Sequence, residues 1–233
     1  MGESLVRHRP TSHREEPATA ALETARAAAA EAPPAAQVAN TTDPDSRIMK
    51  TAKGWVQGYN AQAAANEHQV VVSCSVTQDA NDVGQYQPMV AKTEDTLGAV
   101  GVTEPIGLVL ADAGYWSEDN ASAAGPDRLI ATLKDWKQRR AAREMGTTTG
   151  PPPQGATPLE AMEHRLRTAE GAVAYATRSH TIEPVFGDHK ENRGWHGFRR
   201  RGIDAVRSEW AFMNASHNLT KLFADQHRQP SLA

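Results

Sequence analysis

Asp112 is the residue best placed for chemistry, and it closes the run Leu110-Ala111-Asp112-Ala113-Gly114. Residues 106–111 before it form an apolar run, which is typical of a strand covered on both faces. A carboxylate at the C-terminal end of such a strand opens onto the crevice where α/β proteins bind ligands. Asp112 is therefore a candidate functional carboxylate, and the alternative is a turn or helix-cap aspartate.

A second candidate is Glu183, which Lys190 follows seven residues later. This spacing is close to two helical turns, so both side chains would project from one helix face. The carboxylate could hold a divalent metal and the lysine could contact a phosphate. Pro184 is compatible with a helix over 182–192 only if Glu183 lies in its first turn, where the helix dipole favours the charged carboxylate. The alternative is an ordinary solvated helix face.

A basic segment follows between His189 and Arg207. Its cationic side chains are Lys190, Arg193, Arg199, Arg200, Arg201 and Arg207. Trp195 and Phe198 alternate with them, and such a patch suits phosphate contacts combined with stacking on an exposed base. The alternative is a solvated basic turn held by two anchoring aromatic residues. A second basic run, Lys134 to Arg143, is a weaker candidate for the same role.

Composition excludes several other classes of protein. The formal net charge of the 233 residues is −3, so only local clustering of charge can indicate nucleic acid. One cysteine, Cys74, excludes an intramolecular disulfide and a multi-cysteine zinc site. Its apolar surroundings predict a buried thiol in a reducing cytosol. The histidines lack metal-ligand spacing, and no apolar stretch approaches the ~20 residues that span a bilayer, so we expect a cytoplasmic protein without membrane contact.

The elements that must position these residues form an α/β pattern. An extended segment over 55–65 and a β-branched strand over 69–76 predict a hairpin with its turn at 66–68. A helix is expected over 81–97, bent or shortened by Pro88, then a strand over 105–112 and a helix start at Ser117. Residues 146–158 predict a loop. Amphipathic helices are expected over 159–176, 182–192 and 204–223.

Segments in a fixed order resemble the DDE transposases of bacterial insertion sequences. They are Thr42-Asp43-Pro44-Asp45-Ser46-Arg47, Gly58-Tyr59-Asn60-Ala61-Gln62, Ala80-Asn81-Asp82, Ala111-Asp112-Ala113-Gly114-Tyr115, Glu183-Pro184-Val185-Phe186-Gly187, Arg193-Gly194 and Arg201-Gly202. The resemblance implies an RNase H-like fold, with a mixed sheet flanked by helices. It implies a partial catalytic domain over 41–224. Residues 1–40 almost lack large apolar side chains, so we expect this segment to be disordered, and we expect a flexible tail over 225–233.

This resemblance also assigns roles. The family holds two divalent metals with Asp, Asp and Glu, so Asp112 would be the second Asp and Glu183 the Glu, with Mg²⁺ or Mn²⁺ between them. Lys190 would assist catalysis, and Arg178 and Lys190 would contact DNA phosphates together with Arg193, Arg199, Arg200 and Arg201. The reaction would be cleavage at transposon ends and strand transfer to target DNA, with a homo-oligomer or full-length transposase as a possible partner.

The resemblance fails at the first carboxylate. The family's first Asp lies on a first strand before the Asp43-Pro44-Asp45 segment, but residues 1–40 contain no aspartate. We therefore expect a sheet without its first strand, with an open edge or a gap, and impaired catalysis. The alternative is a non-catalytic remnant that binds DNA or a full-length transposase.

Overall fold

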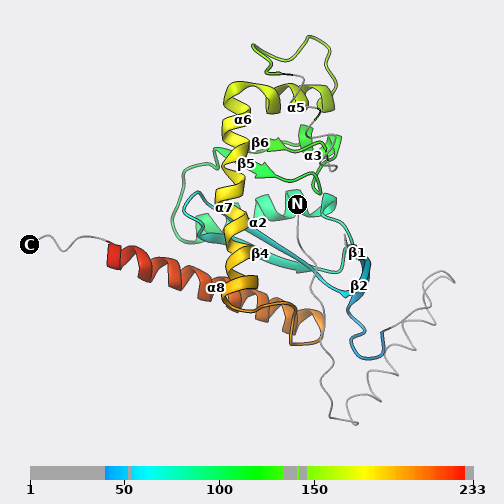
Figure 1. Ribbon diagram of the computed structural model, residues 1–233, viewed down its shortest axis with the longest axis vertical. Helices are drawn as coiled ribbons and strands as arrows, with labels where there is room; N and C mark the ends of the chain where they lie inside the picture. The colour runs from blue at the N-terminus through cyan, green and yellow to red at the C-terminus, as the bar shows by residue number, and fades with distance from the viewer. Residues whose placement is uncertain (1–39, 52–53, 134–140, 142–145, 229–233) are drawn as a thin grey trace, which may run out of the picture.

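The computed structural model describes residues 40–51, 54–133, 141 and 146–228, and every structural statement below concerns these residues. The chain combines short strands with helices on either side of them (Figure 1). The described strands are β1 (Arg47–Thr51), β2 (Gly54–Gly58), β3 (Asn60–Ala65), β4 (Val71–Thr77), β5 (Leu108–Ala111) and β6 (Asp127–Ile130). The mixed α/β class expected from the sequence is therefore confirmed.

The expected hairpin is present as β3 and β4, which pair antiparallel from Asn60 opposite Thr77 to Ala65 opposite Val71. The Asn66 side chain closes its turn by accepting hydrogen bonds from the backbone N–H groups of His68 and Val70. The extended segment expected over 55–65 is two strands. Residues 54–58 pair with β1 in a separate hairpin, and the completely buried Tyr59 separates the two strands.

The sequence predicted a mixed sheet with an open edge or a gap, and the described strands do not form one continuous sheet. β5 pairs in parallel with β6, so the described strands make three two-stranded sheets, β1–β2, β3–β4 and β5–β6. Among the described strands, β3 pairs with β4 and β5 pairs with β6.

The helices differ from expectation mainly at their ends. The described helices are η2 (Val83–Gln85), α2 (Tyr86–Ala99), α3 (Glu118–Ser122), α5 (Pro158–Arg167), α6 (Ala169–Ala176), α7 (Arg178–Gly187), η3 (Asp188–Asn192) and α8 (Ile203–Arg228). Pro88 occupies the first turn of α2, where its missing N–H costs little, so it marks the start of the helix instead of bending it. The Ser117 cap on α3 is confirmed by its bond from Asn120 N.

The amphipathic helix expected over 159–176 is broken into α5 and α6 at Thr168. Thr168 ends α5 in an extended conformation and caps α6 through its hydroxyl, which accepts from Gly171 N at 3.0 Å. The two helices pack closely at this corner, where a Cβ at Gly171 would clash with the carbonyl oxygen of Arg165. Periodicity alone could not reveal the break, since apolar spacing continues through it.

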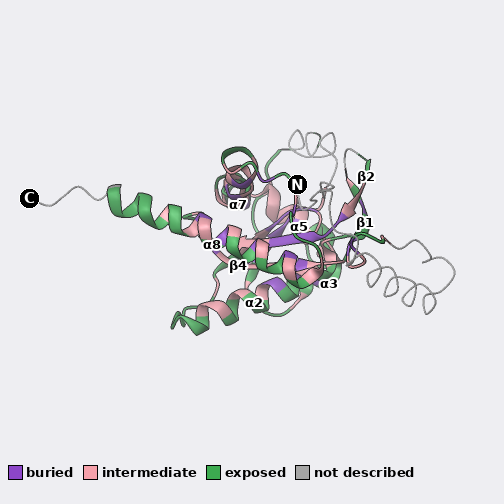
Figure 2. Ribbon diagram, turned by 90° about the horizontal axis from the view of Figure 1, so that it is seen from below, coloured by how far each residue is buried: buried purple, intermediate pink, exposed green. Residues whose placement is uncertain are grey.

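The main core lies between the β3–β4 hairpin and α8. Its buried residues are Tyr59, Ala61, Val76, Trp195, Phe198, Val206 and Trp210. Figure 2 shows α2 and α7 on opposite sides of β4, with the distal part of α8 extending away and exposed. None of the described helices combines the length and apolar character that a membrane span requires.

Candidate active site

Asp112 directly follows β5, as the sequence predicted, and its side chain is only 4% exposed. Its Oδ1 accepts a hydrogen bond from Gly114 N at 2.7 Å, which fixes the carboxylate in the turn after the strand. Tyr175 on α6 donates its hydroxyl to the carbonyl oxygen of Ala111 at 3.2 Å. The end of β5 is thereby tied to the helices that carry the second candidate acid.

Glu183 lies in the middle of α7, not in its first turn. The helix begins at Arg178, so Glu183 is its sixth residue and Pro184 is an internal proline, which corrects the sequence interpretation. An internal proline leaves the carbonyl four residues earlier without its helical donor. Here Gln69 Nε2 donates to that carbonyl, His180 O, at 2.8 Å. The β3–β4 turn thus replaces the hydrogen bond that Pro184 removes.

Arg178 joins the two candidate acids. Its Nη2 lies 3.4 Å from Asp112 Oδ2, and its Nη1 lies 2.9 Å from Glu183 Oε1. The Arg178 side chain is only 11% exposed, whereas the Glu183 side chain is 53% exposed. Two carboxylates 71 positions apart in the sequence therefore converge on one cation. The sequence predicted both acids and the arginine, but not that the arginine would lie between them.

A third carboxylate, Asp82, lies on the other side of Asp112. A Cβ placed on Gly114 would be 2.6 Å from Asp82 Oδ2 and 2.8 Å from Asp112 Oδ1, so the two acids flank this glycine. Asp82 Oδ1 accepts from Asn60 Nδ2 and Gln62 Nε2, both at 2.8 Å. The amides of β3 therefore hold Asp82 beside the end of β5.

Tyr115 completes this polar cluster, since its hydroxyl is hydrogen-bonded to Gln62 Oε1. Burial raises the pKa of the Tyr115 hydroxyl far above its ordinary value, and the charges of Asp82 and Asp112 raise it further. The hydroxyl therefore stays protonated and serves as a hydrogen-bond donor. No chemical role was predicted for Asp82, Tyr115, Asn60 or Gln62, although all four lie within the segments that carry the resemblance.

These groups open into a cavity of about 790 Å³. Its polar lining includes Asp82, Asp112, Arg178, Glu183 and Lys190. Glu183 and Lys190 thus reach the same space, as their spacing suggested. Among the residues that the structure describes, no group of three or more His, Cys, Asp or Glu side chains is arranged to hold a metal ion.

The donor set nevertheless suits a hard divalent cation in part. Mg²⁺ binds oxygen ligands and uses one or two carboxylates together with water or phosphate oxygens. Asp112 and Glu183 supply such oxygens, and the Arg178 guanidinium already supplies positive charge between them. A metal ion bound by both acids would have to replace Arg178 in this position.

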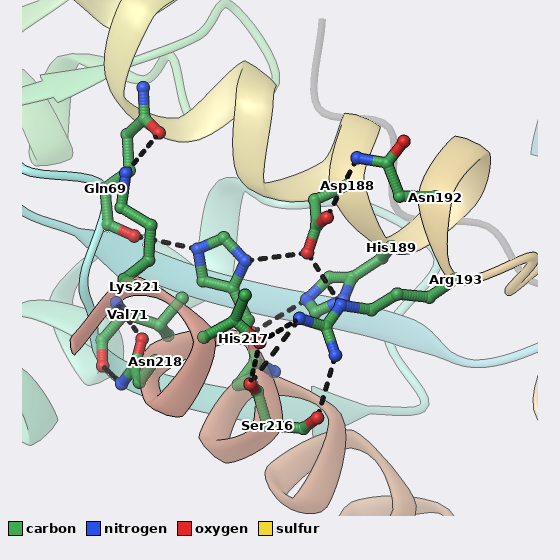
Figure 3. A network of polar contacts seen from close by, with 12 residues as sticks. Gln69, Val71, Asp188, His189, Asn192, Arg193, Ser216, His217, Asn218 and Lys221 are labelled. Atoms are coloured by element: carbon green, nitrogen blue, oxygen red, sulfur yellow. Dashed lines mark hydrogen bonds and ion pairs between the residues drawn. The ribbon is translucent and has the colours of Figure 1, made fainter. Parts of the chain in front are cut away.

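A polar network behind the site holds the segment that carries Lys190 (Figure 3). Asp188 Oδ2 accepts from Arg193 Nε at 2.7 Å and lies 2.9 Å from His217 Nδ1. Burial alone would raise the pKa of Asp188, but hydrogen bonds from His217, Arg193 and Asn192 outweigh it and hold the pKa far below its ordinary value. These contacts hold the π-helical turn η3 against α8.

Arg193 also helps to hold η3 against α8. Its guanidinium also donates to Ser216 Oγ at 2.8 Å and to Thr220 Oγ1 at 2.9 Å. The predicted DNA contact of Arg193 therefore competes with a role in packing η3 on α8. Arg199, Arg200 and Arg201 are exposed, as phosphate contacts require.

The aromatic residues of the basic segment are part of the core, which decides between the two interpretations left open. Trp195 is 7% exposed and Phe198 is 2% exposed, and Trp195 stacks on Trp210 with ring centroids 5.1 Å apart. Neither ring is available to stack on a base, so both anchor the turn. The basic run at 134–143 and the segment 1–39 lie outside the described residues, except for Ala141.

Asp43 and Asp45 take a structural role at the start of α8. Asp43 Oδ1 accepts from Tyr59 Oη at 2.7 Å and from Gly202 N at 3.1 Å. Asp45 Oδ2 accepts from Ile203 N at 2.9 Å. Carboxylates at a helix N-terminus stabilise its unpaired N–H groups and its dipole. Both acids therefore stabilise the start of α8.

Comparison with known proteins gives one family. Residues 137–223 match the model of a family described as "Transposase DDE domain". The match supports a DDE-type transposase. It contains Arg178, Glu183 and Lys190, but Asp112 lies before its start. Searches of curated proteins and of solved structures gave no match.

Proposed function

We propose that this chain is descended from a DDE transposase of the insertion-sequence type and that it acts on DNA through Asp112 and Glu183. The observation that carries the proposal is the convergence of these two acids on Arg178, at 3.4 and 2.9 Å, beside a cavity that Lys190 also lines. The family match over 137–223 supports the same chemistry, because it contains the acid, the arginine and the lysine on one helical segment.

In this proposal Asp112 and Glu183 would hold Mg²⁺ or Mn²⁺. When bound, the ion would activate water or a 3′-hydroxyl and stabilise the leaving oxygen in an in-line phosphoryl displacement. Arg178 releases its carboxylates and turns to a phosphate oxygen, for which its planar fork is suited. Lys190 neutralises charge on the phosphate, and the exposed Arg199, Arg200 and Arg201 contact the DNA backbone.

We further infer that strand cleavage by these 233 residues alone is impaired. The family uses three acids, and residues 1–40 supply no aspartate before the Asp43-Pro44-Asp45 segment. Loss of one bridging acid removes geometry that the displacement requires. A cytoplasmic location and assembly with a second copy or a full-length transposase accompany this proposal.

The second candidate function is DNA binding without cleavage. The observation that favours it is the position of Arg178, whose guanidinium neutralises the two acids in the place where a metal would bind. The exposed arginines at 199–201 would still attract phosphates. An experiment can distinguish cleavage from binding, because only cleavage depends on the two carboxylates and a divalent ion.

The experiment incubates the full chain with supercoiled plasmid in Mg²⁺, Mn²⁺ or EDTA, and measures binding to the same DNA across a salt series. The proposal expects slow nicking that needs the divalent ion and is lost in Asp112→Asn and Glu183→Gln, but not in the exposed control Asp95→Asn. Salt-sensitive binding without nicking would establish the second function. Nicking that persists in both acid variants would overturn the assignment of the site.

A further inference from the structure

The β1–β2 hairpin presents large apolar side chains to solvent. Trp55 is 69% exposed and Ile48 is 49% exposed. Lys50 pairs with Trp55 across the hairpin, and Ile48 pairs with Gln57. Because side chains alternate between the two faces of a strand, these paired residues lie on one face. Met49 on the other face is only 1% exposed, so one face of the hairpin is buried and the other is open to solvent.

Both ends of the hairpin are held against the basic turn over 199–201. Asp45 lies just before β1, and its Oδ2 accepts a hydrogen bond from Ile203 N at 2.9 Å. Tyr59 lies just after β2 and packs edge-on against Phe198, with ring centroids 6.2 Å apart. Figure 1 shows the hairpin beside the start of α8, which directly follows this turn. The hairpin and the basic turn are therefore neighbours, although they are distant in the sequence.

The hairpin and the turn carry the same sign of charge. Residues 46–58 contain three Lys or Arg residues and no Asp or Glu. Residues 194–202 contain three arginines and likewise no acid. Glu209 holds the backbone of this turn by accepting from Arg199 N and Arg200 N, each at 2.9 Å, and the three arginines are exposed. A partner that covers both segments is therefore expected to be negatively charged.

An exposed tryptophan among cations is typical of a surface that binds single-stranded nucleic acid. The ring stacks on an unpaired base, while Lys and Arg side chains contact the phosphates. A duplex offers only its phosphates and base edges to such a surface, because its base faces are stacked on one another. Trp195 and Phe198 are buried and cannot stack on a base, but Trp55 supplies an exposed ring beside the same arginines.

We propose that the β1–β2 hairpin and the basic turn over 199–201 form one surface that binds single-stranded DNA. Trp55 stacks on an unpaired base, and Lys50, opposite it across the hairpin, contacts the phosphate backbone. The arginines of the turn extend the contact to further phosphates.

This surface is separate from the proposed metal site. The residues that line the cavity beside Asp112 include none from the hairpin and none from the turn over 199–201. The inference rests on the proposed function in taking DNA as the partner, but it depends on neither carboxylate. Binding of a single strand can therefore be measured without a divalent ion.

The experiment measures the fluorescence anisotropy of a labelled oligothymidine and of a labelled duplex of the same length with the full chain in EDTA. Trp55→Ala is expected to weaken binding of the single strand at least about fivefold, the lower end of what base–aromatic stacking contributes. Trp55→Phe keeps a ring and should lose less affinity. Both variants should change duplex binding less than about twofold, because the stacked bases of a duplex are not available to the ring. Lys50→Gln should weaken binding of both DNAs and lower its salt dependence by about one phosphate contact.

Phe212→Ala is the matched control, because it removes a 75% exposed ring from α8, and it is expected to leave both affinities unchanged. Asp112→Asn and Glu183→Gln should bind the single strand like the wild type, so failure of the metal site and failure of this surface are distinguishable. Urea unfolding of Trp55→Ala checks that the fold is intact. The proposal is overturned if the wild type does not bind the single strand, or if Trp55→Ala binds it equally well. Equal losses for the single strand and the duplex, or an equal loss in Phe212→Ala, would also contradict it.

Discussion

Gly114→Ala tests the contact between the acidic groups most sharply. The backbone at Gly114 does not adopt a positive φ, so alanine is conformationally acceptable there. The obstacle is space, because the new Cβ would lie 2.6 Å from Asp82 Oδ2 and 2.8 Å from Asp112 Oδ1. Ordinary contacts of this kind begin above 3 Å, so at least one carboxylate must move.

Neither carboxylate can move without losing hydrogen bonds. Asp82 is held by the amides of Asn60 and Gln62, and Asp112 Oδ1 is held by Gly114 N. Loss of one or two such bonds costs roughly 1–1.5 kcal/mol each. Overpacking of a tight site costs about 1–3 kcal/mol in general. We therefore expect Gly114→Ala to lower the free energy of unfolding by about 2–3 kcal/mol.

The assay is urea unfolding of the wild type, Gly114→Ala and the matched control Gly107→Ala. Gly107 lies just before β5, also lacks a positive φ, and has no atom within 4 Å of an added Cβ. The control is expected within about 0.5 kcal/mol of the wild type, as surface substitutions usually are. If Gly114→Ala proves as stable as Gly107→Ala, Asp82 and Asp112 do not flank this glycine as described.

Three further predictions concern the helices behind the site. Gln69→Ala is expected to lower the free energy of unfolding by about 1 kcal/mol, because His180 O loses its donor. In a Pro184→Ala background the new N–H of residue 184 can donate to that carbonyl, so most of this loss should disappear. Equal losses in both backgrounds, measured by urea unfolding, would contradict the role of Gln69. Asp188→Asn should be about 2 kcal/mol less stable at pH 7, because the lowered pKa of Asp188 contributes stability above its unfolded pKa of about 4. That difference should shrink as the pH falls below about 4, and a difference that grows on acidification would refute it. His189 is fully buried, and this burial lowers its pKa. Its contribution to stability is therefore fully present at pH values above the unfolded pKa of about 6.5. At lower pH the free energy of unfolding decreases by up to ~1.4 kcal/mol per pH unit. His189→Phe should remove that slope between pH 6.5 and 5 in chemical unfolding, and an unchanged slope would exclude His189 as its source.

Local signals allowed much of the site to be predicted. The apolar run that ends in Asp112, the β3–β4 hairpin and the Ser117 cap each depend on a few neighbouring residues. The sequence predicted that Glu183 and Lys190 lie on one helix face. The helical spacing between them is kept although the chain changes from α7 to the π-helical turn η3 between these residues. In each case the nearby sequence contains the physical cause of the structure.

Features set by distant contacts could not be predicted. Pro184 predicted a helix start, but Gln69 supplies the missing hydrogen bond from a turn more than 100 residues away. Asp82 becomes part of the site only because β3 presents two amides to it. Trp195 and Phe198 have the composition of a base-stacking patch, but packing on Trp210 places both in the core. The separation of the β3–β4 and β5–β6 pairs likewise depends on which strands are neighbours.

Titration with Mn²⁺, followed by electron paramagnetic resonance of the free ion, tests the central claim most directly. The account predicts that the wild type and Asp95→Asn bind Mn²⁺, and that Asp112→Asn and Glu183→Gln bind at least tenfold more weakly. Arg178→Gln should bind more tightly, because it removes the cation that lies between the two acids. Equal Mn²⁺ affinity in the wild type and both acid variants would contradict the assignment of Asp112 and Glu183 as a metal-binding pair.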